Sequence, residues 1–431
     1  MSMKRIKWVH TVTSIGAVAA VSLLAGCASS AGSESTDEGG PTTFKLMFSS
    51  PSAQESPYER LAAAYMAEFP DRKVELDRQP MDQYDTILRT QLQAGNAADL
   101  VQSAPGSGQL RSVVALADAG FLEPLPESSY EIIPEGSEDL FAIDGVAYGQ
   151  PLDFTVTTGV VNMTALAGFG IDEYPQTFDE LLDACDVASA EGGSFGTLAG
   201  TVPRSVGTMA QVISATRVYE ETPDWNQQRA AGEVTFADSE GWRDTIETFQ
   251  TMHEAGCFQP GAEGAGGDVA ARLLSTNEAV VNFAPGVVSV ELAKAAPEDT
   301  EWAIQAFPPA DGGEPFIIGS SDFSLSITEG AENAEAAQVF LDWLADPAQG
   351  EMYMEASGTL PVSGYADMDL ESTIYAPVAD LLTSGQTVAL PVNRWPNPLV
   401  FEALTNGLQG LLIGQGSVDS VLEAMDAAWD Q

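Results

Sequence analysis

Histidine and positive charge are both scarce in this sequence. Only two histidines occur in 431 residues, and 17 lysines and arginines stand against 63 aspartates and glutamates, which gives a formal net charge of −46. Beyond the first 26 residues only His253 remains, so a histidine-rich metal site is excluded and a Ser-His-Asp triad is not expected. Such an acidic surface repels nucleic acid and anionic lipid, so neither is predicted as a partner. A neutral or cationic solute fits it better than an anionic one.

The motifs of cofactor-binding and catalytic proteins are also missing. There is no Walker loop and no GxGxxG pattern, and the glycine-rich run 264–267 lacks both a lysine and a preceding strand, so it is interpreted as a turn. Acidic residues are so numerous that a pair with glycosidase spacing would arise by chance. The acidic segment 367–371 lacks the glycine and the spacing of an EF-hand. The sequence therefore predicts no metal, no cofactor and no enzymatic activity.

The N-terminus has the pattern of a secreted lipoprotein. Three basic residues precede an uncharged apolar stretch at 15–24, which is too short to span a bilayer in a mature protein. The stretch ends in Leu-Ala-Gly-Cys, which resembles the bacterial lipobox and makes Cys27 the lipidated residue. We predict a signal peptide at 1–26 and a flexible tether at 27–42, which holds almost no apolar residues. This pattern predicts an extracytoplasmic protein, anchored to the cell membrane only through its lipid.

Two cysteines remain in the body, Cys185 and Cys257. An even pair in an oxidising compartment predicts a disulfide. The alternative is two buried thiols, because a sequence does not show whether two Cα atoms lie close enough for a bond.

Strand-like and helix-like segments alternate along the body. This alternation predicts α/β architecture with a largely parallel sheet, and about 400 residues after the signal favour two lobes over one core. Capping signals begin helices at Thr177 and Asp346. Alternating apolar residues predict one strand over 316–327. The other predicted strands include 44–48, 74–76 and 99–101, and the helices between them include 61–69 and 84–92.

Several segments, in order and spacing, are similar to the carbohydrate-binding branch of the bacterial extracellular solute-binding proteins, the group that includes maltose-binding protein. The segments that carry the resemblance include 92–100, 116–125, 144–151, 174–182, 340–344 and 358–361, and the resemblance covers nearly all of 43–431. It implies a two-lobed, type II periplasmic-binding-protein fold that closes like a clamshell. By analogy, lobe one is 43–150 plus 316–360, lobe two is 156–310 plus 365–431, and the hinge crossings lie near 151–155, 310–316 and 360–364.

Sugar sites need aromatic faces for the C–H patches of the ring and planar polar groups for its hydroxyls. In an open α/β sheet such groups gather at the carboxyl ends of the strands. This criterion selects residues after two strands and at the first crossing, namely Ser49, Ser50, Gln54, Gln102, Ser103, Asp153, Phe154 and Thr155. Ser320, Ser321 and Asp322 lie near the second crossing.

Two further segments carry predicted ligand contacts by resemblance to the family. Phe283 ends an apolar strand that leads into a turn, although the turn has Gly286 where a tryptophan would support a maltose-type site. The strongest expectation falls on Asn393, Arg394 and Trp395, which lie in a loop flanked by prolines. The alternative for Trp395 is that its ring packs beneath the loop.

The resemblance implies a monomeric binding protein that captures a sugar or oligosaccharide and delivers it to the permease subunits of an ABC importer. A first alternative keeps the fold but changes the cargo to a phosphorylated solute or a polyamine, with Arg204 and Arg394 as phosphate-binding residues. A second alternative is a surface glycan hydrolase. A third is an adhesion or sensor role for the same clamshell.

Overall fold

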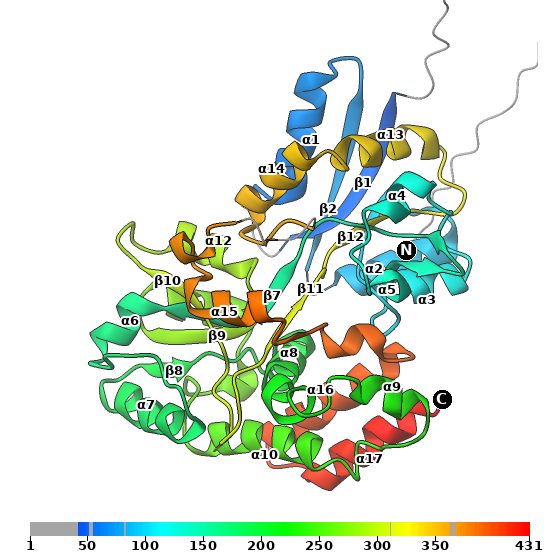
Figure 1. Cartoon of the computed structure of the whole chain (residues 1–431). Helices are drawn as coiled ribbons and strands as arrows, with labels where there is room; N and C mark the ends of the chain where they lie inside the picture. The colour runs from blue at the N-terminus through cyan, green and yellow to red at the C-terminus, as the bar shows by residue number, and fades with distance from the viewer. Residues whose placement is uncertain (1–41, 51–54, 82, 311, 363–364, 366–367) are drawn as a thin grey trace, which may run out of the picture. The chain divides into compact units, whose positions relative to one another are not determined.

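The computed structural model describes residues 42–431 except 51–54, 82, 311, 363–364 and 366–367 (Figure 1). The described residues all belong to the unit Gly40–Gln431. The predicted signal peptide, the lipidation site Cys27, nearly all of the tether and Gln54 lie outside the described residues.

The first of two large sheets has the strand order β2-β1-β3-β12-β6. Its strands are β1 (Thr43–Ser50), β2 (Lys73–Pro80), β3 (Leu100–Ser103), β6 (Gln150–Pro151) and β12 (Ser324–Ile327). β1 pairs in parallel with β2 and β3, whereas β12 runs antiparallel to β3 and β6. Because of these directions, the carboxyl ends of β1, β3 and β6 and the amino end of β12 lie at one edge of the sheet.

Helices with local start and stop signals cover this sheet. Helix α1 (Pro57–Glu68) begins with a capping box between Ser56 and Glu59, and α2 (Tyr84–Ala94) ends at Gly95, whose φ of 67° suits glycine. The aromatic rings of Phe44 and Phe340 join β1 to α13 with centroids 5.2 Å apart. The other elements of this lobe are α3 (Val113–Asp118), α4 (Glu127–Glu131), α5 (Glu138–Phe141), β4 (Ala142–Ile143), β5 (Val146–Ala147), α13 (Ala334–Leu344) and α14 (Pro347–Ser357).

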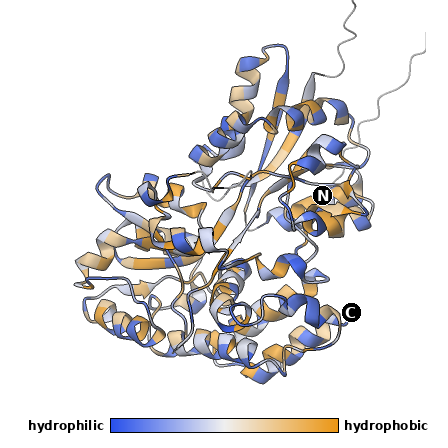
Figure 2. Ribbon diagram, viewed as in Figure 1, coloured by the Kyte–Doolittle hydropathy of each residue, from blue (hydrophilic) through white to orange (hydrophobic). Residues whose placement is uncertain are grey.

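The second sheet has the order β13-β11-β7-β9-β8, and β10 also pairs with β7. Its strands are β7 (Thr155–Asn162), β8 (Ser194–Gly196), β9 (Ala279–Pro285), β10 (Trp302–Gln305), β11 (Ile317–Ser320) and β13 (Thr387–Val388). All eight residues of β7 are buried, because hydrophobic clusters cover both faces of this sheet. Figure 2 shows these central strands largely in the hydrophobic colours, with mixed colouring on the helices around them.

Helices of the second sheet form two groups, one on each face. One face packs against α6 (Met163–Gly168), α7 (Phe178–Ala190), α8 (Pro203–Ser214), η1 (Ala215–Tyr219), α9 (Trp225–Ala230), α10 (Glu240–Glu254), α16 (Pro398–Leu412) and α17 (Val418–Trp429). The other packs against α11 (Gly267–Ser275), α12 (Val288–Ala295) and α15 (Ala379–Ser384). The short helical turns are η2 (Ala262–Gly264), η3 (Leu370–Ser372), η4 (Ala376–Val378) and η5 (Pro391–Arg394).

Two local predictions for this part of the chain are confirmed. The capping box at Thr177 and Glu180 starts α7. Cys185 on α7 forms a disulfide with Cys257, which follows α10, and the two Cα atoms are 4.7 Å apart. The alternative of two free thiols is therefore wrong.

We call each sheet with its helices a lobe, the first and the second in the order given above. The chain passes between lobes at 152–154, inside the predicted first crossing. The second crossing was predicted at 310–316 and one strand at 316–327, and both predictions are wrong. β11 belongs to the second sheet and β12 to the first, so the chain crosses at 321–323. The alternation of apolar and polar residues over 316–327 continues across the passage at 321–323. The sequence pattern therefore did not indicate that two strands of different sheets meet there.

Hydrogen bonds hold the passages side by side. The amide of Leu152 donates to the carbonyl of Phe323 at 3.0 Å, and Phe154 and Leu360 exchange two backbone hydrogen bonds at 2.8 and 2.9 Å. Leu360 lies in the predicted third crossing, of which 363–364 are outside the described residues. Among the helices that the structure describes, none has both the length and the apolar character needed to cross a membrane.

Candidate functional site

The functional edge of each sheet is fixed by strand direction. In the second sheet, β9, β11 and β13 end, and β7 begins, at the edge from which the passages lead to the first sheet. In the first sheet, the passages leave the edge that holds the ends of β1 and β3. The two edges therefore share the passages 152–154 and 321–323, and loops after the strands supply side chains there.

Asp153 ties two passages together. Its side chain is fully buried and accepts hydrogen bonds from the Thr155 hydroxyl at 2.7 Å and from the amides of Asp322 and Phe323, both at 3.3 Å. Burial raises the pKa of Asp153 to about 7, and the nearby Asp322 adds to the rise, while the hydrogen bonds oppose it. A buried carboxyl with such a displaced pKa is typical of functional sites.

The second passage presents polar groups that the protein leaves unused. The carboxylate of Asp322, in a residue only 6% exposed, makes no hydrogen bond or ion pair with any residue that the structure describes. Burial raises its pKa, and the positive charges of Arg111 and Arg204 partly offset that rise. Next to it, the buried Ser321 hydroxyl also lacks a partner. Buried polar groups without partners cost about 1–3 kcal/mol each, so such groups indicate a place for a ligand.

Two arginines from different lobes approach the same carboxylate. Arg111 follows β3 in the first lobe and Arg204 begins α8 in the second. Their guanidinium nitrogens lie 3.5 and 3.3 Å from Asp85 at the start of α2. The Arg111 side chain is 2% exposed, and its Nε has no partner. These contacts are long for charge-assisted hydrogen bonds, so the arginines keep donors for a further acceptor.

Some of the predicted residues gather at this edge but are already bonded to one another. The Ser49 hydroxyl and amide both donate to Gln102 at 2.8 Å. Ser103 is fully buried and shares hydrogen bonds with Ser324 and Ser326 on β12. These residues lie where the sequence predicted, but their hydrogen bonds join strands of the first sheet.

Other predicted residues lie in the first passage, at the end of β11 and in η5. The Phe154 ring packs against Tyr365 with centroids 4.9 Å apart. The Ser320 hydroxyl accepts a hydrogen bond from the Leu390 amide at 3.2 Å. Asn393 is 1% exposed, and its side-chain NH2 has no partner, so it resembles Ser321 in offering an unused donor.

Three predicted ligand contacts face elsewhere. Phe283 packs against Phe307 in the core of the second lobe, and Trp395 is 0% exposed among aromatic residues that include Phe236 and Trp242. Trp395 therefore follows the alternative of packing beneath the loop. Arg394 makes a bidentate ion pair with Asp139 at 3.0 Å, which occupies the guanidinium that a phosphate would need.

Four residues of this region, Asp85, Arg111, Tyr58 and Tyr353, were not predicted as ligand contacts from the sequence. Arg204 was predicted only as a contact for a phosphorylated cargo. Tyr58 and Asp85 lie in the first turns of α1 and α2, and the rings of Tyr58 and Tyr353 are 6.0 Å apart. The signal that could have found some of them is position: several begin the helices that follow the strands of the first sheet. Tyr353 on α14 had no such signal.

The site has the chemistry of a binding site. Carboxylates, guanidiniums, hydroxyls and an amide surround it, and together they can both accept and donate hydrogen bonds to a polar solute. No group of three or more His, Cys, Asp or Glu residues suited to a metal ion exists in the described part of the chain.

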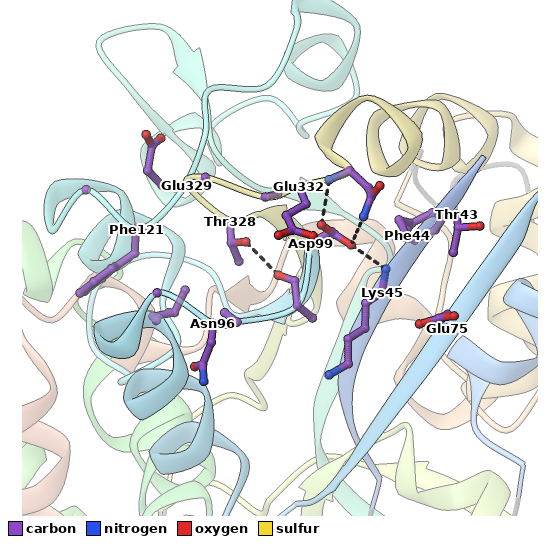
Figure 3. A pocket seen from close by; sticks show the side chains of 18 residues that line it. Thr43, Phe44, Lys45, Glu75, Asn96, Asp99, Phe121, Thr328, Glu329 and Glu332 are labelled. Carbon is purple, nitrogen blue, oxygen red and sulfur yellow. Dashed lines mark hydrogen bonds between the residues drawn. The ribbon is translucent and has the colours of Figure 1, made fainter. Parts of the chain in front are cut away.

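A separate pocket of about 670 Å³ lies at the opposite end of the first sheet, around the amino ends of β1 and β3 (Figure 3). There the Asp99 carboxylate accepts hydrogen bonds from the Lys45 amide at 2.8 Å and from the amide and side chain of Asn333 at 3.0 and 3.3 Å. Since Asp99 is bonded to its neighbours, it fastens β1 to the start of α13. Strand direction and unpartnered groups favour the passages as the functional site.

The chain was also compared with known proteins. Residues 49–351 match the family model for the bacterial extracellular solute-binding protein. No curated protein matches the sequence significantly.

Solved structures share the fold at low sequence identity. A chitin oligosaccharide binding protein is 19% identical with a TM-score of 0.75, covering 90% of this chain and 99% of its own. The solute-binding protein RafE in complex with raffinose is 16% identical with a TM-score of 0.72, and the coverages are 90% and 99%. An ABC transporter solute-binding protein from Thermotoga lettingae, bound with α-D-tagatose, is 18% identical with a TM-score of 0.73 and the same coverages. The fold is therefore the two-lobed α/β fold of these proteins.

Proposed function

Because the chain belongs to the family of bacterial extracellular solute-binding proteins, we propose that it captures a sugar or oligosaccharide between its lobes and delivers it to an ABC importer. The observation that carries the proposal is the set of buried polar atoms that have no partner among the described residues, on Ser321, Asn393 and Arg111, together with the buried carboxyl of Asp322. A sugar hydroxyl donates and accepts at once, so it can pair with each of these groups.

The arrangement of the passages supports a hinge. Each passage is a short segment without regular structure, and backbone hydrogen bonds join Leu152 to Phe323 and Phe154 to Leu360. Rotation about these neighbouring segments would open and close the space between the lobes with small changes elsewhere. In this proposal the lobes are 42–151 with 324–357 and 155–320 with 370–431, a revision of the predicted boundaries by the strand assignments.

The location and partners follow from the same family. Lipidation of Cys27, a tether that ends near residue 42, and permease subunits as the docking partner are part of the proposal. A protein that only captures and releases its cargo needs no catalytic residue, so we propose that it is not an enzyme. Replacement Cys27→Ser should move the protein from the membrane fraction to the soluble fraction.

A phosphorylated cargo has weaker support than a neutral sugar. It would rely on Arg204 and Arg394, but the ion pair with Asp139 already engages Arg394. The carboxyl groups of Asp153 and Asp322 at the passages would also oppose an anionic group wherever they are ionised.

The test is thermal unfolding of the chain from residue 28 onward against neutral mono- and oligosaccharides, including raffinose, tagatose and chitin oligosaccharides. Ligand at about 100 times its dissociation constant adds about 2.7 kcal/mol, which shifts the midpoint by several degrees. A shift with one class of sugar would support the proposal and identify the cargo. No shift with any neutral sugar, together with a shift for phosphorylated or cationic solutes, would reject the carbohydrate assignment.

A further inference from the structure

Four charged side chains at the passages are close together but poorly paired. Asp85 and Arg111 come from the first lobe, Arg204 from the second, and Asp322 from the passage between them. The only ion-pair contacts among them are those of the two arginines with Asp85, at 3.5 and 3.3 Å. We call these four residues the charge quartet.

Arg111 is the least satisfied member of the charge quartet. Its guanidinium carries five N–H donors, yet its side chain is 2% exposed, and its one ion-pair contact among the described residues is 3.5 Å long. Burying a cation this poorly paired is costly, and a protein retains such a group where a ligand completes its hydrogen bonds.

Arg204 brings a second positive charge into the same region. The charge of Arg111 is the main cause that lowers the pKa of Arg204, ahead of burial, so the guanidiniums are near enough to repel each other. The single negative charge of Asp85 does not neutralise the guanidiniums of both Arg111 and Arg204. The buried Asp322 supplies the second negative charge, since the charges of Arg111 and Arg204 both act on it.

The quartet is therefore neutral in sum, with donors and acceptors held apart. A guanidinium only donates and a carboxylate only accepts, and a hydroxyl group can bridge the two by accepting from one and donating to the other. A charged group placed there would leave one buried charge uncompensated, which is strongly unfavourable.

We propose that the charge quartet is the specificity-determining part of the site, that it binds neighbouring hydroxyls of an uncharged sugar, and that it rejects acidic and amino sugars. This inference rests on the proposed function and names its substrate class. Because Arg204 comes from the second lobe and the other members do not, the complete quartet forms only when the lobes are together.

The experiment measures dissociation constants by calorimetry for the chain from residue 28 onward, at pH 6, where Asp153 with its pKa of about 7 is mostly protonated. The probes are the best neutral sugar of the thermal panel, and glucose, glucuronate and glucosamine as a matched charge series. The variants are Asp322→Asn and Arg204→Met. Arg243→Met is the control, because Arg243 has a similar exposure of 37%, against 34% for Arg204, and also pairs with one carboxylate, Asp419.

We expect both quartet variants to weaken binding of the neutral sugar by about 10-fold to 100-fold, the loss of one charged hydrogen bond, and the control to change it less than 2-fold. Asp322→Asn leaves the quartet with a net positive charge, so it should shift the preference toward glucuronate. Arg204→Met leaves it negative and should shift the preference toward glucosamine. Unfolding midpoints identify a variant that fails to fold, and Arg204→Met at the partly exposed position is the variant expected to fold in any case.

The outcomes separate the two proposals. If the unchanged protein binds a neutral sugar and both variants bind it equally well, the proposed role of the charge quartet is wrong, whereas the proposed sugar-binding function stands. If the unchanged protein prefers glucuronate to glucose, the proposal that the charge quartet rejects acidic sugars is also wrong. If it binds no sugar in the panel, the proposed function itself fails.

Discussion

At the scale of single residues, Asp153 makes the site sensitive to pH. It is buried where the passages meet and binds the backbone of the second one. Its raised pKa means that the folded protein holds a proton that the unfolded chain has released between about pH 4 and pH 7. The stability that this proton contributes is fully present below about pH 4 and is lost as the pH rises through about 7.

Replacement Asp153→Asn removes this titration. We expect the unfolding free energy of the natural protein, relative to the variant, to fall by a few kcal/mol between pH 4 and pH 8, because folding raises the pKa of Asp153 to about 7. Urea unfolding at several pH values measures it. Asp186→Asn, at an exposed position, serves as the control for the loss of one negative charge. A difference between Asp153→Asn and the natural protein that does not vary with pH would contradict the prediction.

Trp395 is a second residue whose position decides its role. Its ring packs against Phe236 and Trp242, with centroids 5.9 and 6.0 Å away. Replacement Trp395→Ala should lower the unfolding free energy by about 3–5 kcal/mol through the cavity it leaves. Sugar affinity of the folded variant should change little. A large loss of sugar affinity with normal stability would contradict this and would support a direct contact between Trp395 and the sugar.

At the scale of elements, the disulfide Cys185–Cys257 holds together the outer part of the second lobe. It joins α7 to the segment after α10 across a separation of 72 residues. Closing a loop of that length restricts the unfolded chain, which is the main origin of its stabilising effect.

The double replacement of Cys185 and Cys257 by alanine should therefore cost about 2–5 kcal/mol in unfolding free energy. Denaturant unfolding measures the loss. Reduction of the natural protein should reproduce it, and the same reductant should leave the double variant unchanged. If the reductant lowers the stability of the double variant equally, the bond is not the cause.

At the scale of the whole molecule, contacts between lobes extend beyond the passages. Ser107 in the first lobe donates from its amide to the Asn393 carbonyl at 3.1 Å and from its hydroxyl to the Trp395 carbonyl at 2.7 Å. The neighbouring Gly106 has φ of 68°, and a Cβ there would lie 1.6 Å from the Asn393 carbonyl oxygen. The two backbones meet so closely that only glycine fits.

If this contact forms when the lobes close, Gly106→Ala should weaken sugar binding by about 10-fold or more. Gly95→Ala is the matched control, because Gly95 has φ of 67° with nothing within 4 Å of the added Cβ. Both variants carry the same backbone strain of about 1 kcal/mol. Calorimetry measures the sugar affinity of each variant, and denaturant unfolding measures its stability, so a loss of binding can be told apart from backbone strain. Equal affinities for the two variants would show that the contact has no part in closure.

Several features followed from the sequence alone because they depend on neighbours in the chain. The capping signals at Thr177 and Asp346 and the alternation of strands and helices are local patterns of side chains. The family could also be inferred, since its segments keep their order. The sequence also named Cys185 and Cys257 as the two members of a predicted disulfide, but only the structure, with Cα atoms 4.7 Å apart, decided against two free thiols.

The tertiary structure alone decided which polar residues meet. Asp85, Arg204 and Asp322 are far apart in the sequence, and no local pattern shows that strand order brings them to one edge. Likewise, the ring of Trp395 and the guanidinium of Arg394 follow one another in a loop, yet one packs in the core and the other pairs with Asp139. Burial and ion pairing depend on segments that approach only in the folded chain. Local sequence patterns therefore determined the fold class and most of the elements, while long-range packing determined the crossing at 321–323 and the site.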